Sequence, residues 1–227
     1  AAGATAAAGG PAALCKATFV VSREFHAANR RRVGLMREHG GTAEVDWGSV
    51  ERGGRVVVRE GETVNGGYDH IDIPRALIDW HSHPGKCKSR SVCALGVPSP
   101  DDMRNVFIGA FSGSLGHLVY AKEGTFAIQV SPSLLSAKRP LMLADERAFR
   151  RAADAVRAGF QRVYEEYYDD SAVRYAEYRA RWVAEARRQG FVVRLFKGDA
   201  RPYLRSAFEC RYRTLDPSAQ VVEPAFE

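Results

Sequence analysis

The chain of 227 residues contains 33 lysines and arginines against 27 aspartates and glutamates, which gives a formal net charge of +6. Apolar residues make up 45 % and charged residues 26 %, an ordinary globular composition that excludes a collagen, a wholly disordered chain and a disulfide-dense miniprotein. The basic excess is mild and dispersed, so nucleic acid is not an expected partner. No run of about 18 apolar residues occurs, so we expect no segment that spans a membrane.

The first thirteen residues are rich in Ala and Gly and lack the basic start and long apolar stretch of a signal peptide. We interpret residues 1–13 as a flexible arm, and the initial Ala1 as the sign of a processed product or a fragment. Four scattered cysteines are too few for a disulfide-stapled secreted fold and favour an intracellular location, cytoplasmic or nuclear: Cys15, Cys87, Cys93 and Cys210.

Residues 14–138 carry strand, helix and turn signals in the order β-α-β-β-β-α-β-β, which predicts a mixed α/β domain. Ser22 can cap the first helix, and the Gly40-Gly41 pair is typical of a helix end. In chain order, the patterns predict a strand at 15–22, a helix at 23–39, a hairpin of strands 43–50 and 55–59, a strand at 76–80, a loop at 84–98, a helix at 100–111 and a hairpin of strands 117–122 and 125–131.

Residues 139–227 read as a helical extension that ends in two short strands. Apolar residues recur every three or four positions through 149–167, which indicates a helix with one apolar face. Residues 169–171 interrupt the pattern, a second helix is predicted at 172–189, and strands are predicted at 191–196 and 203–212. The many aromatic residues indicate helices packed on the domain, or a face within 141–189 that binds a protein partner.

The chemistry is concentrated in two short motifs, His81-Ser82-His83 and Ser99-Pro100-Asp101-Asp102. Two histidines two positions apart on an extended segment point the same way, so His81 and His83 can share one metal ion. A catalytic zinc takes three protein ligands and leaves its fourth position to water. Asp102 can supply the third ligand if the helix that follows Ser99 starts beside the end of the histidine strand.

This arrangement resembles the JAMM (MPN+) metalloprotease family, whose pattern is a Glu, then H-[ST]-H, about seven residues and S-x-x-D. The family places its Glu at the start of the strand after the first helix, and Glu44, 37 positions before His81, occupies that place. The resemblance covers about residues 14–135 and implies a cytidine deaminase-like MPN core with a mixed, mostly antiparallel sheet. The acidic residues that compete with Glu44 are Glu24, Glu38 and Asp46.

The resemblance implies a zinc metalloprotease that hydrolyses an amide or isopeptide bond, with ubiquitin or a ubiquitin-like protein as the substrate. Zinc, held by His81, His83 and Asp102, lowers the pKa of bound water to about 7 in such sites. Glu44 would then accept the proton of the water as general base, and Ser99 would donate a hydrogen bond to the oxyanion.

One departure from the family pattern opens an alternative. Fifteen residues separate His83 from Ser99, so an insertion that contains Cys87 and Cys93 lies in the expected active-site loop. His81, His83 and these two cysteines could instead form a closed structural zinc site. The cysteines could also clip the insertion with a disulfide, and the other histidines are expected to be structural or surface residues: His26, His39, His70 and His117.

Two further alternatives concern the helix start and the function class. Ser at the N-cap, Pro at the first helical position and Asp at the third form a strong helix start without any metal, so the motif at 99–102 can also be a cap. A non-enzymatic assembly subunit, for instance of a virion or a multiprotein complex, would keep the fold and use the helices within 141–189 for contacts.

Overall fold

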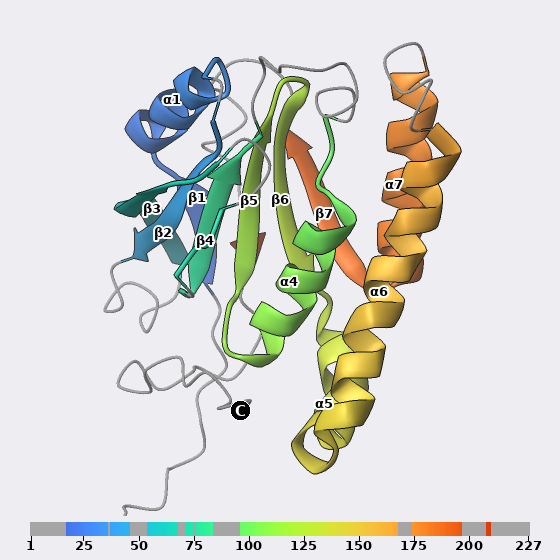
Figure 1. The fold of residues 1–227 in the computed structure, drawn as a ribbon. Helices are drawn as coiled ribbons and strands as arrows, with labels where there is room; N and C mark the ends of the chain where they lie inside the picture. The colour runs from blue at the N-terminus through green and yellow to red at the C-terminus, as the bar shows by residue number, and fades with distance from the viewer. Residues whose placement is uncertain are drawn as a thin grey trace, which may run out of the picture.

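The computed structural model describes residues 17–35, 37–45, 54–67, 71–74, 76–83, 96–167, 174–196 and 208–209. Their strands form one eight-stranded sheet with the order β7-β6-β5-β4-β2-β3-β1-β8. The pairs β1–β3 and β4–β5 are parallel and the other pairs are antiparallel, so the sheet is mixed and mostly antiparallel. Figure 1 shows α1 beside one end of this sheet and α4, α6 and α7 beside the other.

The order β-α-β-β-β-α-β-β predicted for residues 14–138 is confirmed, and with it the α/β class. The extension adds three helices and two strands. The elements are β1 (Ala17–Val21), α1 (Arg23–Arg32), β2 (His39–Val45), β3 (Gly54–Asn65), β4 (Ile78–Ser82), α4 (Pro100–Phe111), β5 (Gly116–Ala121), β6 (Gly124–Val130), α5 (Pro132–Ala144), α6 (Glu146–Tyr167), α7 (Tyr175–Arg188), β7 (Phe191–Phe196) and β8 (Phe208–Glu209).

The predicted end of the first helix was wrong. Ser22 caps α1 as expected, since its Oγ accepts the backbone N–H of Phe25 at 3.1 Å, but the helix stops at Arg32. Gly40 and Gly41 lie inside β2 rather than at a helix end. A Cβ at Gly40 would lie 2.8 Å from the carbonyl oxygen of Trp80, so the glycine permits the close approach of β4.

The extension joins the sheet of the preceding region instead of standing apart from it. Its strand β7 pairs antiparallel with β6 at the sheet edge, as the predicted strand at 191–196 allows. Helix α5 was not predicted, although Ser131 followed by Pro132 is a helix-start signal and the Ser131 Oγ accepts the N–H of Leu134 at 3.3 Å. The division of the chain at residue 138 stays a prediction.

Alternating side chains of the sheet build two separate cores. On the α1 face, Phe25 packs against Trp80 and Tyr120, and all three are buried. On the opposite face, α4, α6 and α7 contribute Phe107, Phe160 and Trp182 to a second cluster. Strand β4 runs between the two cores, so Trp80 enters the first core and the next residue, His81, faces the helices of the second.

Several sequence predictions fall outside the described residues. These are the arm at 1–13, residues 84–95 of the loop insertion predicted at 84–98, the interruption at 169–171 and most of the strand predicted at 203–212, of which the pair Phe208–Glu209 is described beside β1. All four cysteines also lie outside them. Among the described helices, none is long and apolar enough to cross a membrane.

Candidate metal centre

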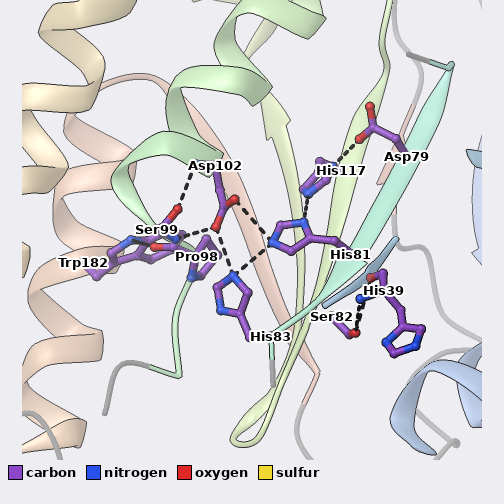
Figure 2. Close-up of polar contacts among 10 residues, drawn as sticks. All are labelled: His39, Asp79, His81, Ser82, His83, Pro98, Ser99, Asp102, His117 and Trp182. Carbon is purple, nitrogen blue, oxygen red and sulfur yellow. Dashed lines mark hydrogen bonds and ion pairs between the residues drawn. The ribbon is translucent and has the colours of Figure 1, made fainter. Parts of the chain in front are cut away.

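Strand β4 presents two histidines from its C-terminal end. It is hydrogen-bonded to β2 on one side and to β5 on the other, and the N–H of His83 continues the second ladder by donating to the carbonyl of Tyr120 at 2.8 Å. The backbone of the histidine segment is therefore fixed from both sides. The rings of His81 and His83 lie on the same side of the strand, as the period-two alternation predicted (Figure 2).

Helix α4 brings the third predicted ligand to these rings. The Nε2 of His81 is 3.3 Å from Asp102 Oδ1, and the Nε2 of His83 is 3.2 Å from Asp102 Oδ2. The two Nε2 atoms are 3.0 Å apart. His81, His83 and Asp102 are thus the group of described residues that can hold a metal ion, as the sequence predicted.

The spacing of these three donors fits a tetrahedral ion. Zinc lies about 2.0–2.1 Å from its nitrogen and oxygen ligands, and tetrahedral geometry at that radius separates two ligands by about 3.3 Å. The two Nε2 atoms are 3.0 Å apart, and each lies 3.3 or 3.2 Å from a different oxygen of Asp102, so these separations are close to that value. One ligand atom from each of the three residues lies within 4.8 Å of the other two. Two imidazole nitrogens and one carboxylate oxygen also suit other divalent transition metals, so these ligands do not identify which metal binds.

A capping box at the start of α4 fixes the orientation of Asp102. The Ser99 Oγ accepts the backbone N–H of Asp102 at 3.1 Å, and Asp102 Oδ2 accepts the N–H of Ser99 at 2.6 Å. The helix-start role predicted for this motif is therefore confirmed. It is compatible with metal binding, because the cap uses Oδ2 while Oδ1 faces His81.

The same surroundings keep Asp102 ionised. Burial opposes its negative charge, but the charges of His81 and His83 and their hydrogen bonds outweigh that effect and hold the pKa of Asp102 well below its ordinary value. Asp102 and His83 are partly exposed, whereas His81 is buried. The centre therefore has an inner ligand, His81, and an outer side formed by the other two.

Behind His81 lies a polar chain that the sequence analysis missed. The Nδ1 of His81 is 2.7 Å from the Nε2 of His117, and the Nδ1 of His117 contacts Asp79 Oδ1 (Figure 2). His117 is buried at the start of β5. The sequence does show a polar residue, His117, at the start of an otherwise apolar strand. Its contact with Asp79 depends on the parallel register of β4 and β5, which sets the two residues opposite each other.

Glu44, the predicted general base, is not brought to this group. It is exposed on β2, its Cγ lies over Gly61 of the neighbouring β3, and the residue opposite it in the β2–β3 register is Arg59. In β2, the residue opposite His81 is Gly40, so Glu44 is four positions, or about 13 Å, further along the strand. Among the competing residues, Glu24 is exposed in the first turn of α1, and Asp46 is outside the described part of the chain.

Glu38 is the remaining competitor for the role of general base. It directly precedes β2 and is half-buried, and its N–H and C=O bond to the backbone of Gly67 and Gly66. The adjacent residue, His39, is paired with Ser82, which stands between the two histidines of the group. Its own ring lies apart from the group, with Nδ1 against the carbonyl of Arg37.

Helices of the extension hold the segment that leads into α4. The indole N–H of Trp182 donates to the carbonyl of Pro98 at 3.1 Å, and Trp182 is buried. Arg157 of α6 pairs with Asp101 at 2.6 Å in the first turn of α4. The extension therefore contacts the backbone directly before Ser99 and thereby fixes the start of the helix that carries Asp102.

Cys87 and Cys93 lie outside the described residues, so the closed structural zinc site stays an alternative. Comparisons of this chain with protein-family models, with curated proteins and with solved structures found no significant match. The residues of the centre and their geometry are therefore the basis for a functional assignment.

Proposed function

We propose that this protein is a zinc-dependent hydrolase of the JAMM type that cleaves an amide bond, either peptide or isopeptide. The observation that carries the proposal is the convergence of His81, His83 and Asp102, whose ligand atoms lie within 4.8 Å of one another. Three protein ligands of this kind are typical of catalytic zinc sites, since the fourth position stays open to water. The cytidine deaminase-like MPN core implied by the motif is part of the proposal.

Zinc in such a site polarises the amide carbonyl and makes water a better nucleophile near neutral pH. The residues of the chain do the rest. Ser99 Oγ uses a lone pair to accept the Asp102 N–H, so its own proton is left to donate to the oxygen that becomes negative during hydrolysis. Loss of such a donor raises the barrier by about 2.7–4 kcal/mol.

For the general base we propose Glu38 in place of Glu44. The antiparallel pairs His39–Ser82 and Gly40–His81, continued by one residue, set Glu38 opposite His83. Residues opposite each other in a sheet share a face, so this position is on the face of the metal ligands. Glu44 lies four positions, or about 13 Å, along β2 from Gly40, the residue opposite His81, which is further than a glutamate side chain reaches.

The substrate class follows from the motif alone, which points to the carboxyl-terminal bond of ubiquitin or a ubiquitin-like protein. The test is turnover of di-ubiquitins and of ubiquitin-like proteins carrying a fluorogenic C-terminal amide, with the full chain loaded with zinc and then treated with a chelator. We expect turnover that the chelator removes and that zinc restores.

Variants sharpen this test. Glu38→Gln should keep zinc and lose turnover, whereas Glu44→Gln should keep both. His39→Ala is the matched control, because His39 lies one strand away and its ring bonds to the backbone of Arg37 instead of the ligand group. Turnover that survives the chelator would contradict the proposal, and bound zinc without turnover of any substrate would favour the assembly-subunit alternative.

A further inference from the structure

Three buried or half-buried polar side chains form a line on the α4 face of the sheet. His81 and Asp79 come from β4, and His117 comes from the parallel strand β5. The register sets Asp79 opposite His117, and His81 is two residues further along, on the same face. The contacts run without a branch from Asp79 Oδ1 to His117 Nδ1, and from His117 Nε2 to His81 Nδ1 at 2.7 Å.

One placement of protons satisfies every contact in this line. A neutral imidazole carries one N–H, so a His81 that offers its Nε2 lone pair to a metal must carry its proton on Nδ1. That proton is donated to His117 Nε2, which must then be an acceptor. The proton of His117 is therefore on Nδ1, where Asp79 Oδ1 accepts it. Every N–H points away from the ligand group, and the line ends on a carboxylate.

We propose that His117 and Asp79 are positioning residues of the metal centre. They hold His81 as the Nδ1–H tautomer, keep its Nε2 aimed at the ion, and make this nitrogen a stronger donor through the carboxylate at the end of the line. Partners of this kind behind a metal-bound histidine commonly contribute a factor of about 10–100 to metal affinity. The inference rests on the proposed metal-binding function and extends it beyond the three ligands.

The two histidine ligands differ in this respect. In the described part of the chain, the polar contacts of the His83 ring run through Nε2, to His81 and to Asp102. His83 is also more exposed, with 19 % of its side chain accessible against 4 % for His81. His81 is thus the ligand that the interior of the protein orients, and His83 lies on the side from which a substrate would approach.

Packing alone does not account for this line. Burying a histidine and a carboxylate costs desolvation free energy, and apolar residues of similar volume fill such a space without that cost. If His117 were only a filler, an aromatic ring of similar size would replace it well. If His117 positions His81, a residue that keeps the hydrogen bonds to His81 and Asp79 should replace it better than an aromatic ring does, even if its shape differs.

The experiment compares His117→Phe, which keeps the volume, with His117→Gln, whose amide can accept from His81 and donate to Asp79. Zinc affinity is measured by competition with a chromophoric chelator, and the ligand field by the visible spectrum of the cobalt form. We expect His117→Phe to lose about 10–100-fold in zinc affinity and to shift the cobalt spectrum. His117→Gln should recover most of both.

Histidine ¹⁵N NMR of the zinc-loaded protein tests the tautomer directly, and His26→Gln, on the other face of the sheet, is the matched control. We expect the Nδ1–H form of zinc-bound His81 in the wild type, and in His117→Phe a mixture of zinc-bound forms with the proton on either ring nitrogen. Zinc bound equally by wild type and His117→Phe, or an Nε2–H form of His81, would overturn this inference while the metal centre stands. A wild-type chain that binds no zinc would overturn the proposed function as well.

Discussion

Buried histidines lie on both faces of the sheet, and their surroundings differ. On the α1 face, the ring of His26 stacks on Tyr120 with a centroid distance of 5.8 Å. Burial, with a smaller contribution from the positive charge of Arg30, lowers the pKa of His26 to about 4. On the α4 face, His81 lies between His117 and the carboxylate of Asp102.

The comparison shows which surroundings make a buried histidine suitable for binding a metal ion. His26 and His81 are both buried, but the line of imidazoles on the α4 face ends on two carboxylates, those of Asp79 and Asp102. On the α1 face the neighbouring charge is a cation, so His26 is kept neutral and serves packing. Trp80 and His81 are adjacent in β4, so a single step along the strand separates the two environments.

The largest effect we expect is the loss of metal binding when a candidate ligand on the α4 face is removed. His81→Ala and Asp102→Ala each remove one of three donors, so neither variant should retain a stoichiometric zinc ion after gel filtration, as measured by plasma emission spectrometry. His26→Gln changes the other face and should retain it. Stoichiometric zinc in a His81→Ala/Asp102→Ala double variant would refute the assignment of these ligands.

A second prediction concerns the α1 face and acid. Because the pKa of His26 falls from 6.5 to about 4 on folding, the unfolded chain binds the additional proton between these values. The contribution of neutral His26 is fully present above pH 6.5 and is lost as the pH falls towards 4, by about 3 kcal/mol in free energy of unfolding.

Urea unfolding at pH 7, 5.5 and 4 measures this slope, and His26→Gln removes the titrating group. The wild type should lose more unfolding free energy over this range than the variant does. The carboxyl group of Asp102 also has a lowered pKa, but its contribution is lost at low pH in both proteins and cancels in the comparison. Parallel pH profiles for the two proteins would contradict the prediction.

A third prediction uses two buried tryptophans, one on each face. Trp80 donates its indole N–H to the carbonyl of Thr42 at 3.2 Å, and Trp182 donates to that of Pro98 at 3.1 Å. Replacing either by Phe leaves a carbonyl without this donor, and each variant should lose about 1–3 kcal/mol of unfolding free energy.

The two variants should differ in metal affinity. Pro98 directly precedes the cap of α4, so Trp182→Phe should weaken zinc binding several-fold, measured by chelator competition. Trp80 belongs to a strand that is hydrogen-bonded on both sides, so Trp80→Phe should leave zinc affinity nearly unchanged. Equal losses of zinc affinity in both variants would show that general destabilisation, and not the Pro98 contact, sets the effect.

The ligand group was predictable because its members carry local signals. The spacing of His81 and His83 fixes their common direction on any strand, and Ser99 with Asp102 defines a helix start by short-range chemistry. What the sequence could not supply was the register between distant segments. His117 was treated as a structural or surface residue because its role depends on the parallel pairing of β4 with β5.

The missing strand register also explains why a helix end was wrongly predicted at Gly40-Gly41. Two glycines after a helical pattern are typical of a helix end, but here they permit close contact with β3 and β4. The helix stops earlier, so β2 begins at His39. Glu38, and not Glu44, therefore lies next to the residues of β2 that pair with Ser82 and His81. The wrong boundary placed the start of this strand at residue 43 and so led to the prediction of Glu44, whereas the base proposed above, Glu38, lies six positions earlier.

The smallest effect we expect separates capping from metal binding on the α4 face. Ser99→Ala removes the cap of α4 and Ser131→Ala removes that of α5, so each should cost about 1 kcal/mol in free energy of unfolding. Only Ser99 bonds to the backbone N–H of a ligand residue, so Ser99→Ala should also lower zinc affinity by a few-fold. The Asp102 side chain stays held by the backbone N–H of residue 99 in this variant, which is why the loss is small. An unchanged zinc affinity in Ser99→Ala, with the stability loss present, would show that the backbone bond alone orients the carboxylate.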